Sequence, residues 1–407
     1  MRLIEKQAKN RLGLSHSKLN GRFTFLQDIT SQNISSGLIS SILVMTGPVL
    51  IILKAAHAGH FTDHQTINWI FADYFFSGIL GIFMSLVYRI PITAGNTISG
   101  VAFLATVTSH ITYPELIGGF VMSGLIIYII GISGLFSKFI NWVPIEVISA
   151  MLAGLVTSYV IQIIPSVKAM PLVGGPALFF FFICSRLSKR VPPILVAVIV
   201  AFITLFSIGN LSIESKDIDF FFPSLQMPEF SWMGLITLAL PLAMLILSND
   251  AAPGIGALQS LEFEPPIRNI ISLSGLFSIM AGYLGGQSAN IAGMMTSICS
   301  DTDAGTKSKR YIASLLSGFL TLVFGIFAWK IVPFIQSFPQ AFVSLLAGFS
   351  LIGVLISSLQ KGFSGNRYKL SALTSFLIAL SQVSFLHISA PVWALILGAV
   401  AAKTAEK

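Results

Sequence analysis

Charged residues and cysteines are both scarce in this chain of 407 residues. Only 10% of the residues are Asp, Glu, Lys or Arg and 54% are hydrophobic, whereas roughly a quarter of the residues in a soluble domain are charged. This composition excludes an ordinary soluble fold and indicates a protein that lies in a lipid bilayer. The two cysteines, Cys184 and Cys299, lie in apolar surroundings without the spacing of metal ligands. We therefore expect them to be reduced packing residues, and we expect no metal or other cofactor.

Long apolar segments make up most of the chain. A helix needs about 20 apolar residues to cross the hydrocarbon core of a bilayer. The sequence contains fourteen segments of this kind, with approximate limits 36–53, 67–87, 92–109, 115–134, 145–164, 171–185, 192–208, 233–257, 266–284, 285–300, 310–332, 340–359, 369–384 and 390–402. It therefore predicts an all-α integral membrane protein with fourteen transmembrane segments.

Positive charges are distributed unevenly over the loops between these segments. Of the 24 Lys and Arg residues, 20 fall on the side of the N-terminus, and the exceptions are Lys54, Lys168, Lys216 and Lys330. Cytoplasmic loops of membrane proteins are enriched in Lys and Arg. We therefore expect a multi-pass protein of the inner (plasma) membrane with both termini in the cytoplasm. The basic N-terminal stretch is then an orientation signal and not an arm that binds nucleic acid.

The two halves of the chain resemble each other. Residues 123–155 and 317–349 align without a gap at an offset of 194, and Pro48 falls on Pro241 at an offset of 193. Each half holds an odd number of segments, so the second half enters the membrane in the opposite sense. This predicts a 7+7 inverted repeat, as in alternating-access transporters. The predicted parts are a cytoplasmic segment (1–34), a first repeat (35–208), an extracytoplasmic connector (209–232) and a second repeat (233–402).

The third and tenth segments are short and begin with polar residues. They read "ITAGNTISG" at 92–100 and "GGQSANIAGMMTSICS" at 285–300. We expect each to be a broken span, in which an extended stretch precedes a half-helix that begins near Asn96 or Ser288. Unpaired backbone costs several kcal/mol per group in hydrocarbon, so such a break persists only inside protein or beside a cavity. Close packing of small residues is the alternative explanation for these glycines and serines.

The inverted repeat would point the two half-helix N-termini at each other. Each N-terminus offers free N–H groups and about half a positive charge, which suits an anion or a polar ring. Pro48 and Pro241 suggest a further break in the first and eighth segments that faces the same place. The candidate substrate-binding residues are Thr46, Asn96, Thr97, Ser99, Asn249, Gln287, Ser288 and Asn290.

Several motifs resemble one known family, the benzoate:proton symporters of the BenE type. "SLVYRIPITAGNTISGVAFLAT" is similar to the third-segment signature of that family, and "GGQSANIAGMMTSIC" resembles its tenth segment. "AAHAGH" and "SAMLAG" resemble its first and fifth segments. The family shares its fold with uracil permeases and sulfate transporters. The resemblance therefore implies a core domain (segments 1–4 and 8–11), a gate domain (segments 5–7 and 12–14) and a homodimer formed through the gate.

Some residues expected near the ligand depart from the family pattern. The family usually has Trp-Ser-Thr-Pro-Gly where this chain has Gly95–Ser99, and a His where this chain has Gln287. The resemblance implies a secondary transporter, not an enzyme, that couples the entry of a small organic anion such as an aromatic carboxylate to a proton. Because of these departures, a nucleobase or inorganic anion transporter of the same fold and an anion channel stay as alternatives.

Asp250 is the candidate proton-coupling residue. It lies deep in the eighth segment, shortly before Pro253 and Gly254, and no other acidic residue is expected so far from the end of a segment. An ionised carboxylate is costly at such depth, and desolvation favours its protonated form. The alternatives for Asp250 are an ion pair with a cytosolic Lys or Arg and a position in a water-filled vestibule. Asp73 is the second choice, expected near the outer surface in the first turns of the second segment.

A cluster of histidines after the first segment raises an alternative to transport. His57, His60 and His64 gather there with Asp63 beside them. These residue types are zinc ligands, so a metal site or an enzyme centre is the competing interpretation. We expect a solvated outer loop instead.

Overall fold

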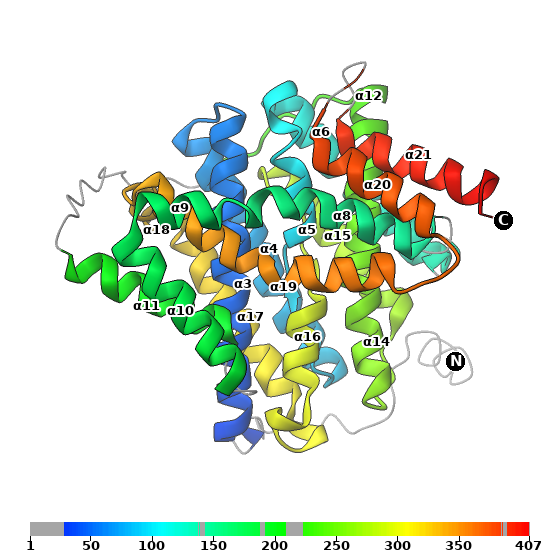
Figure 1. Cartoon of the computed structure of the whole chain (residues 1–407). Coiled ribbons are helices and arrows are strands. Elements are labelled where there is room, and N and C mark those ends of the chain that lie inside the picture. Colours follow the sequence, from blue (N-terminus) through cyan, green and yellow to red (C-terminus); the bar gives the residue numbers. More distant parts are fainter. Residues whose placement is uncertain are drawn as a thin grey trace, which may run out of the picture.

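The computed structural model is almost entirely helical (Figure 1). It describes residues 28–136, 138, 143–187, 192–208, 223–383, 385 and 389–406. Most of the predicted N-terminal segment and of the predicted connector lies outside these residues. Within them, seven helices are long and apolar enough to cross a membrane, and they span Ser31–Ala58, Asp63–Tyr88, Tyr113–Ser133, Ile145–Ala169, Trp232–Ser260, Lys307–Ile326 and Gln340–Phe363. Shorter apolar helices cover Pro171–Leu187, Pro193–Ser207, Lys369–Ser381 and Ala390–Thr404.

One group of helices packs around α3 and α4. Helix α17 lies against both of them, and α6 packs along α15. Several of these helices begin at capping boxes, in which a Thr and a residue three positions later exchange hydrogen bonds with each other's backbone N–H. Thr62 and Gln65 do so at the start of α4, and Thr112 and Glu115 at the start of α6. The bounds are α3 Ser31–Ala58, α4 Asp63–Tyr88, α6 Tyr113–Ser133, α15 Ile267–Tyr283, α17 Tyr311–Ile326 and α18 Ala328–Gln336.

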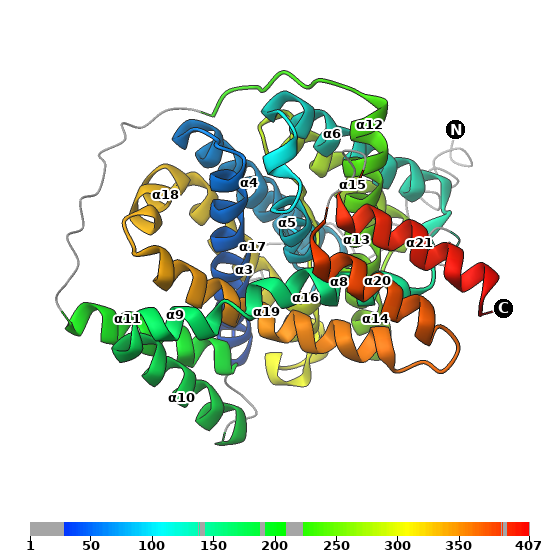
Figure 2. The ribbon, with the colours of Figure 1, turned by 45° about the horizontal axis from the view of Figure 1, so that its top comes forward.

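A second group of helices lies across the first. Helices α8 and α19 run side by side, with α9–α11 at one end and α20 and α21 at the other (Figures 1 and 2). Helix α19 also contacts α3, and α8 contacts the short helix α5 (Ile98–Leu104), so this pair forms the boundary between the groups. The bounds are α8 Ile145–Val160, α9 Ile163–Ala169, α10 Pro171–Leu187, α11 Pro193–Ser207, α19 Gln340–Phe363, α20 Lys369–Ser381 and α21 Ala390–Thr404.

Two short half-helices meet between these groups. Strand β1 (Ala94–Gly95) leads into α5 (Ile98–Leu104), and strand β2 (Asn290–Ile291) leads into α16 (Gly293–Ser300). The strands pair antiparallel, with Ala94 opposite Ile291. All four strand residues are buried. The expected extended stretches are thus present, and part of their backbone is satisfied by pairing with each other inside the protein.

The second half-helix begins later than the sequence suggested. The expected start near Ser288 is wrong, because α16 begins at Gly293. The intervening N–H groups have other acceptors: the N–H of Ala289 bonds to Ser278 Oγ, that of Ile291 to Ser274 Oγ, and that of Ala292 to the Thr93 carbonyl. These tertiary bonds keep the segment extended. The start of α5 is close to the expected position.

The eighth predicted segment is one continuous but distorted helix. It comprises α12 (Trp232–Gly234), α13 (Leu240–Leu245) and α14 (Ala252–Ser260), joined by π-helical turns η2 (Leu235–Ala239) and η3 (Ile246–Ala251). Each of the two π-helical turns precedes a proline, Pro241 or Pro253, that has no N–H for a regular helical bond. Such widened turns recur at functional sites. Turn η3 carries Asn249 and Asp250.

Candidate functional site

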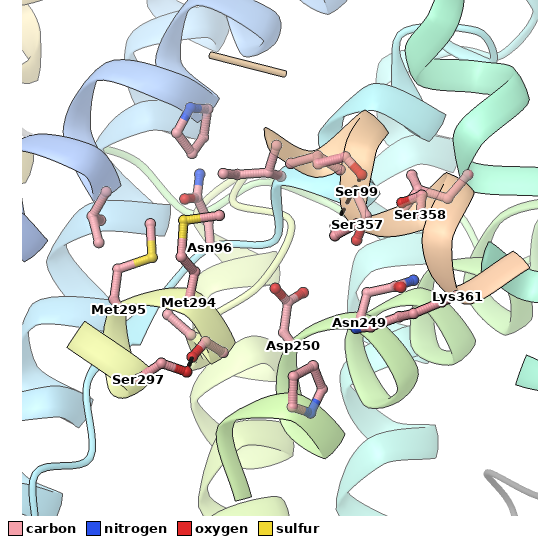
Figure 3. A pocket seen from close by; sticks show the side chains of 18 residues that line it. Asn96, Ser99, Asn249, Asp250, Met294, Met295, Ser297, Ser357, Ser358 and Lys361 are labelled. Atoms are coloured by element: carbon pink, nitrogen blue, oxygen red, sulfur yellow. Dashed lines mark hydrogen bonds between the residues drawn. The ribbon is translucent and has the colours of Figure 1, made fainter. Parts of the chain in front are cut away.

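A pocket of about 260 Å³ opens where the two groups of helices face each other (Figure 3). Helix α3, the half-helices α5 and α16, and turn η3 form one side. Leu152 of α8 and the C-terminal half of α19 form the other. Its polar lining residues are Asn96, Ser99, Asn249, Asp250, Ser297, Ser357, Ser358 and Lys361, and its apolar ones include Val44, Ile98, Leu152, Met294, Met295 and Val354.

Four of the predicted substrate-binding and coupling residues line this pocket. They are Asn96, Ser99, Asn249 and Asp250. They come from two regions far apart in the sequence, the start of α5 and turn η3, which the fold brings to one cavity. Asn96 and Ser99 are buried, whereas Asn249 and Asp250 are half-buried.

Four further predicted residues lie beneath the lining, and three of them connect the half-helices. The Thr97 N–H donates to Ser288 Oγ at 3.3 Å, and Gln287 Nε2 donates to the Thr97 carbonyl at 3.1 Å. Thr97 Oγ1 caps α5 by accepting from the Gly100 N–H. Asn290 Nδ2 donates to the carbonyl of the next residue. These side chains are buried, so they hold the lead-ins to α5 and α16 in place.

Thr46 does not line this pocket. Its hydroxyl donates to the Ile42 carbonyl of its own helix, and it lines a separate apolar cavity of about 100 Å³. Val44 and Pro48 are the α3 residues that reach the pocket beside the half-helices. The face of α3 at this depth therefore presents apolar groups.

Asp73 lies in the interior and not near the outer surface, so the expected interfacial position is wrong. It is fully buried in α4 and accepts three hydrogen bonds: from the Gln287 N–H at 2.7 Å, the Ser288 N–H at 3.2 Å and Asn96 Nδ2 at 3.2 Å. Gly286 makes this approach feasible, because an added Cβ there would lie 2.8 Å from Asp73 Oδ1. A single carboxylate thus joins both half-helix lead-ins to α4.

Asp250 has a different environment at the pocket itself. Its Oδ2 atom is buried and has no hydrogen-bond partner among the described residues, and the same holds for Asn249 Nδ2. Lys361 lines the same pocket. The sequence analysis expected no other acidic residue so far from the end of a segment. This expectation is wrong, because Asp73 also lies in the interior of a long helix.

Lys361, Ser357 and Ser358 are site residues that the sequence analysis missed. The sequence reading counted Lys361 as a cytoplasmic loop residue, because it follows the apolar segment 340–359. Helix α19 in fact continues to Phe363 and carries all three residues to the pocket. A usable signal was their spacing, because residues four apart lie on one face of a helix.

No metal centre forms from the histidines after α3. Within the described part of the chain, no group of three or more His, Cys, Asp or Glu side chains is arranged to hold a metal ion. His57 and Asp63 instead line a cavity together with Lys54 and Gln336. Gln336 donates a hydrogen bond to Asp63.

Comparison with solved structures bears on the fold. The transmembrane domain of a cyanobacterial bicarbonate transporter, BicA, superposes with a TM-score of 0.60 at 18% identity, covering 94% of this chain and 98% of that one. The murine Solute Carrier 26 family member A9 anion transporter, solved in an inward-facing state, gives a TM-score of 0.61 at 12% identity, covering 97% of this chain and 74% of that one. The chain therefore has the fold of these transporters.

Sequence comparison identifies the family. The family model for the benzoate membrane transport protein, BenE, matches residues 27–404. A benzoate membrane transport protein of Acinetobacter baylyi is 28% identical over 380 residues, 93% of this chain and 96% of that one. The inner membrane protein YdcO of Escherichia coli is 26% identical over 378 residues, 92% and 96% of the two chains. With its apolar helices, this supports a multi-pass inner membrane protein. The chain belongs to the benzoate membrane transport family, which consists of transporters and not enzymes.

Proposed function

We propose that this protein is a secondary active transporter that carries a small organic anion, such as an aromatic carboxylate, together with a proton. The observation that carries the proposal is the composition of the pocket, which combines apolar walls, a lysine and buried polar atoms that find no partner among the described residues. The name of the Acinetobacter relative, a benzoate transport protein, agrees with this substrate class.

The pocket suits one small ring with an acidic group. Its volume of about 260 Å³ lies below the roughly 300–1,000 Å³ of pockets for drug-sized ligands. Met294 and Met295 offer sulfur atoms and flexible side chains, which pack well on aromatic rings. Lys361 at the rim supplies a positive charge for a carboxylate. A purely inorganic anion would leave the apolar wall without a partner, so an organic anion is the better match.

The architecture suits alternating access. We infer a 7+7 inverted repeat in which spans 1–4 and 8–11 form a core domain and spans 5–7 and 12–14 form a gate domain. The antiparallel pairing of β1 with β2 supports the inversion, because equivalent pieces of the two repeats meet there. The pocket between the two groups of helices would open to one side or the other as core and gate move past each other. Both termini in the cytoplasm and a homodimer through the gate belong to this proposal.

Asp250 is the group that we propose to carry the proton. Its unpartnered oxygen lies beside the pocket, where a negative charge would repel an incoming carboxylate. Protonation removes that repulsion, so proton and anion enter together and leave together. Asp73 is the second choice, and its three hydrogen bonds leave it less free to change its charge.

Uptake by reconstituted liposomes tests this function. With an alkaline interior, labelled benzoate should enter the reconstituted liposomes faster than protein-free liposomes, which benzoic acid enters passively, and this excess rate should fall when a protonophore collapses the gradient. Counterflow of labelled benzoate against unlabelled benzoate distinguishes a carrier from a channel, because a channel shows none. Accumulation that ignores the pH gradient would contradict proton coupling. An absence of benzoate binding, with thermal stabilisation by a nucleobase or an inorganic anion, would contradict the substrate class.

A further inference from the structure

The hydrogen bonds of Asp73 determine which atom of Asn96 is available to a ligand. Both carboxylate oxygens of Asp73 act as acceptors. Oδ1 accepts from the N–H groups of Gln287 and Ser288, and Oδ2 accepts from Asn96 Nδ2 at 3.2 Å. The amide nitrogen of Asn96 thus points at Asp73, whose two oxygens are already surrounded by three donors. The carbonyl oxygen of Asn96 is consequently left for another partner.

That carbonyl oxygen has no partner within the part of the chain that the structure describes. Asn96 Oδ1 is buried, and Asn96 lines the pocket. Asp250 Oδ2 is also buried, also without a partner and also on a lining residue. Buried polar atoms are normally hydrogen-bonded. Two residues that line the pocket therefore each carry a buried acceptor that no described group satisfies.

The opposite side of the pocket needs a hydrogen-bond acceptor or a negative charge from the ligand. Asn249 Nδ2 is a buried donor that has no acceptor in the described part of the chain, and Lys361 adds a positive charge. Figure 3 shows Asn96 on one side, Asn249 and Lys361 on the other, and Asp250 between them. A matching ligand has an anionic group at one end, a hydrogen-bond donor at the other and an apolar body between.

We propose that the pocket selects an aromatic carboxylate that bears a hydroxyl or amino group on its ring, in preference to the unsubstituted acid. Asn96 receives this ring donor, and Asp73 is the positioning residue that turns the Asn96 carbonyl oxygen toward it. The inference rests on the proposed function and goes beyond it by assigning a second recognition group to the substrate. A site built to bond a ligand hydroxyl rejects the analogue that lacks it.

Binding to the purified wild-type protein tests the ligand class without any substitution. Isothermal titration calorimetry compares benzoate with its meta- and para-hydroxy derivatives and with the matching methoxy acids, which have similar size but no donor. We expect at least one hydroxy acid to bind about tenfold more tightly than benzoate, a difference of about 1.4 kcal/mol. The methoxy acids should bind no more tightly than benzoate.

Two variants locate the preference. Asn96→Leu removes the acceptor and should bring the ratio of hydroxy-acid to benzoate affinity close to one. Asp73→Asn places an NH2 donor where Asn96 now meets an acceptor, so the side-chain amide of Asn96 can rotate and exchange the positions of its oxygen and nitrogen. The ratio of hydroxy-acid to benzoate affinity should fall in this variant too, while benzoate still binds. Asn68→Leu is the matched control, because Asn68 is a buried residue of α4 with an unpartnered Oδ1 that does not line the pocket. The ratio should not change in that variant.

The outcomes separate this inference from the proposed function. Benzoate binding as tightly as every hydroxy acid would overturn the inference and leave the transport of aromatic acids standing. A hydroxy preference that survives Asn96→Leu would overturn the role of Asn96. An equal loss of affinity for all ligands in Asp73→Asn would reduce Asp73 to a structural residue. If no aromatic acid binds the wild-type protein, the proposed function fails as well.

Discussion

Asp73 in α4 and Asp250 in η3 are two carboxylates inside long helices with opposite surroundings. Asp73 is fully buried and accepts three hydrogen bonds, two of them from backbone N–H groups. Asp250 is half-buried at the pocket, and its Oδ2 has no partner in the described part of the chain. Lys361 lines the same pocket as Asp250, whereas no described Lys, Arg or His pairs with Asp73.

This difference in hydrogen bonding separates a structural role, which suits Asp73, from proton exchange, which suits Asp250. Hydrogen bonds from fixed backbone groups hold a carboxylate in one position. Asp73 is therefore suited to hold the half-helices together. A carboxylate with a free oxygen at a cavity can gain or lose a proton without breaking the fold, and Asp250 meets this condition.

The largest expected effect comes from removing the acceptor at Asp73. Asp73→Leu would leave the N–H groups of Gln287 and Ser288 and the amide of Asn96 buried without an acceptor. Each such group costs about 1–3 kcal/mol, so we expect a loss of about 3 kcal/mol or more in stability. Thermal unfolding in detergent measures it. Asp250→Leu is the comparison, and an equal drop in melting temperature for both variants would erase the distinction between the two residues.

The next effect concerns coupling and not stability. Asp250→Asn imitates the protonated form, so the variant should keep substrate binding and exchange but lose uphill uptake driven by an alkaline interior. A coupled proton can drive about tenfold accumulation per pH unit, since 1.4 kcal/mol corresponds to a factor of ten, and uptake by the variant in a pH gradient should be no faster than passive entry into protein-free liposomes. Liposome uptake measures this. If the variant still concentrates substrate, Asp250 is not the coupling site and Asp73 becomes the next candidate.

A smaller effect is expected from the residues that connect the half-helices. Gln287→Ala removes the bond to the Thr97 carbonyl and with it about 1 kcal/mol, which should weaken substrate binding about fivefold through the position of α5. Asn290→Ala should act in the same direction. Folding and membrane insertion should stay nearly intact, as size-exclusion chromatography would report. Unchanged binding in both variants would assign these residues to packing alone.

The smallest effect is expected at Lys361. It is exposed at the rim, and exposed ion pairs contribute only about 0–1 kcal/mol. Lys361→Met should therefore weaken carboxylate binding up to about fivefold, and less at high salt because exposed charges are screened. Lys361→Arg is the control that keeps the charge. The two variants should bind a neutral amide analogue of the ligand with equal affinity. A loss of carboxylate affinity that does not depend on salt would indicate a packing role for Lys361.

The pair of broken segments was predictable, but only in outline. Gly, Asn and Gln residues inside an apolar stretch indicate a break, and both extended stretches and half-helices are present. The start of α16 was expected near Ser288 but lies at Gly293. The segment before it stays extended because Ser274, Ser278 and Thr93 supply hydrogen-bond acceptors for its N–H groups. Those partners belong to other segments, and no local pattern reveals them.

The sequence by itself determined that the chain is a helical membrane protein of the benzoate transport family, because apolar length and motif are local properties. Only the tertiary structure decided which polar groups meet. Asp73, which was expected near the outer surface, is buried beside the half-helices. Thr46 lines a different cavity, and Lys361 lines the pocket although it was expected in a loop. The physical reason is that a buried polar atom must find its partner wherever the fold provides one, and those partners lie in different helices.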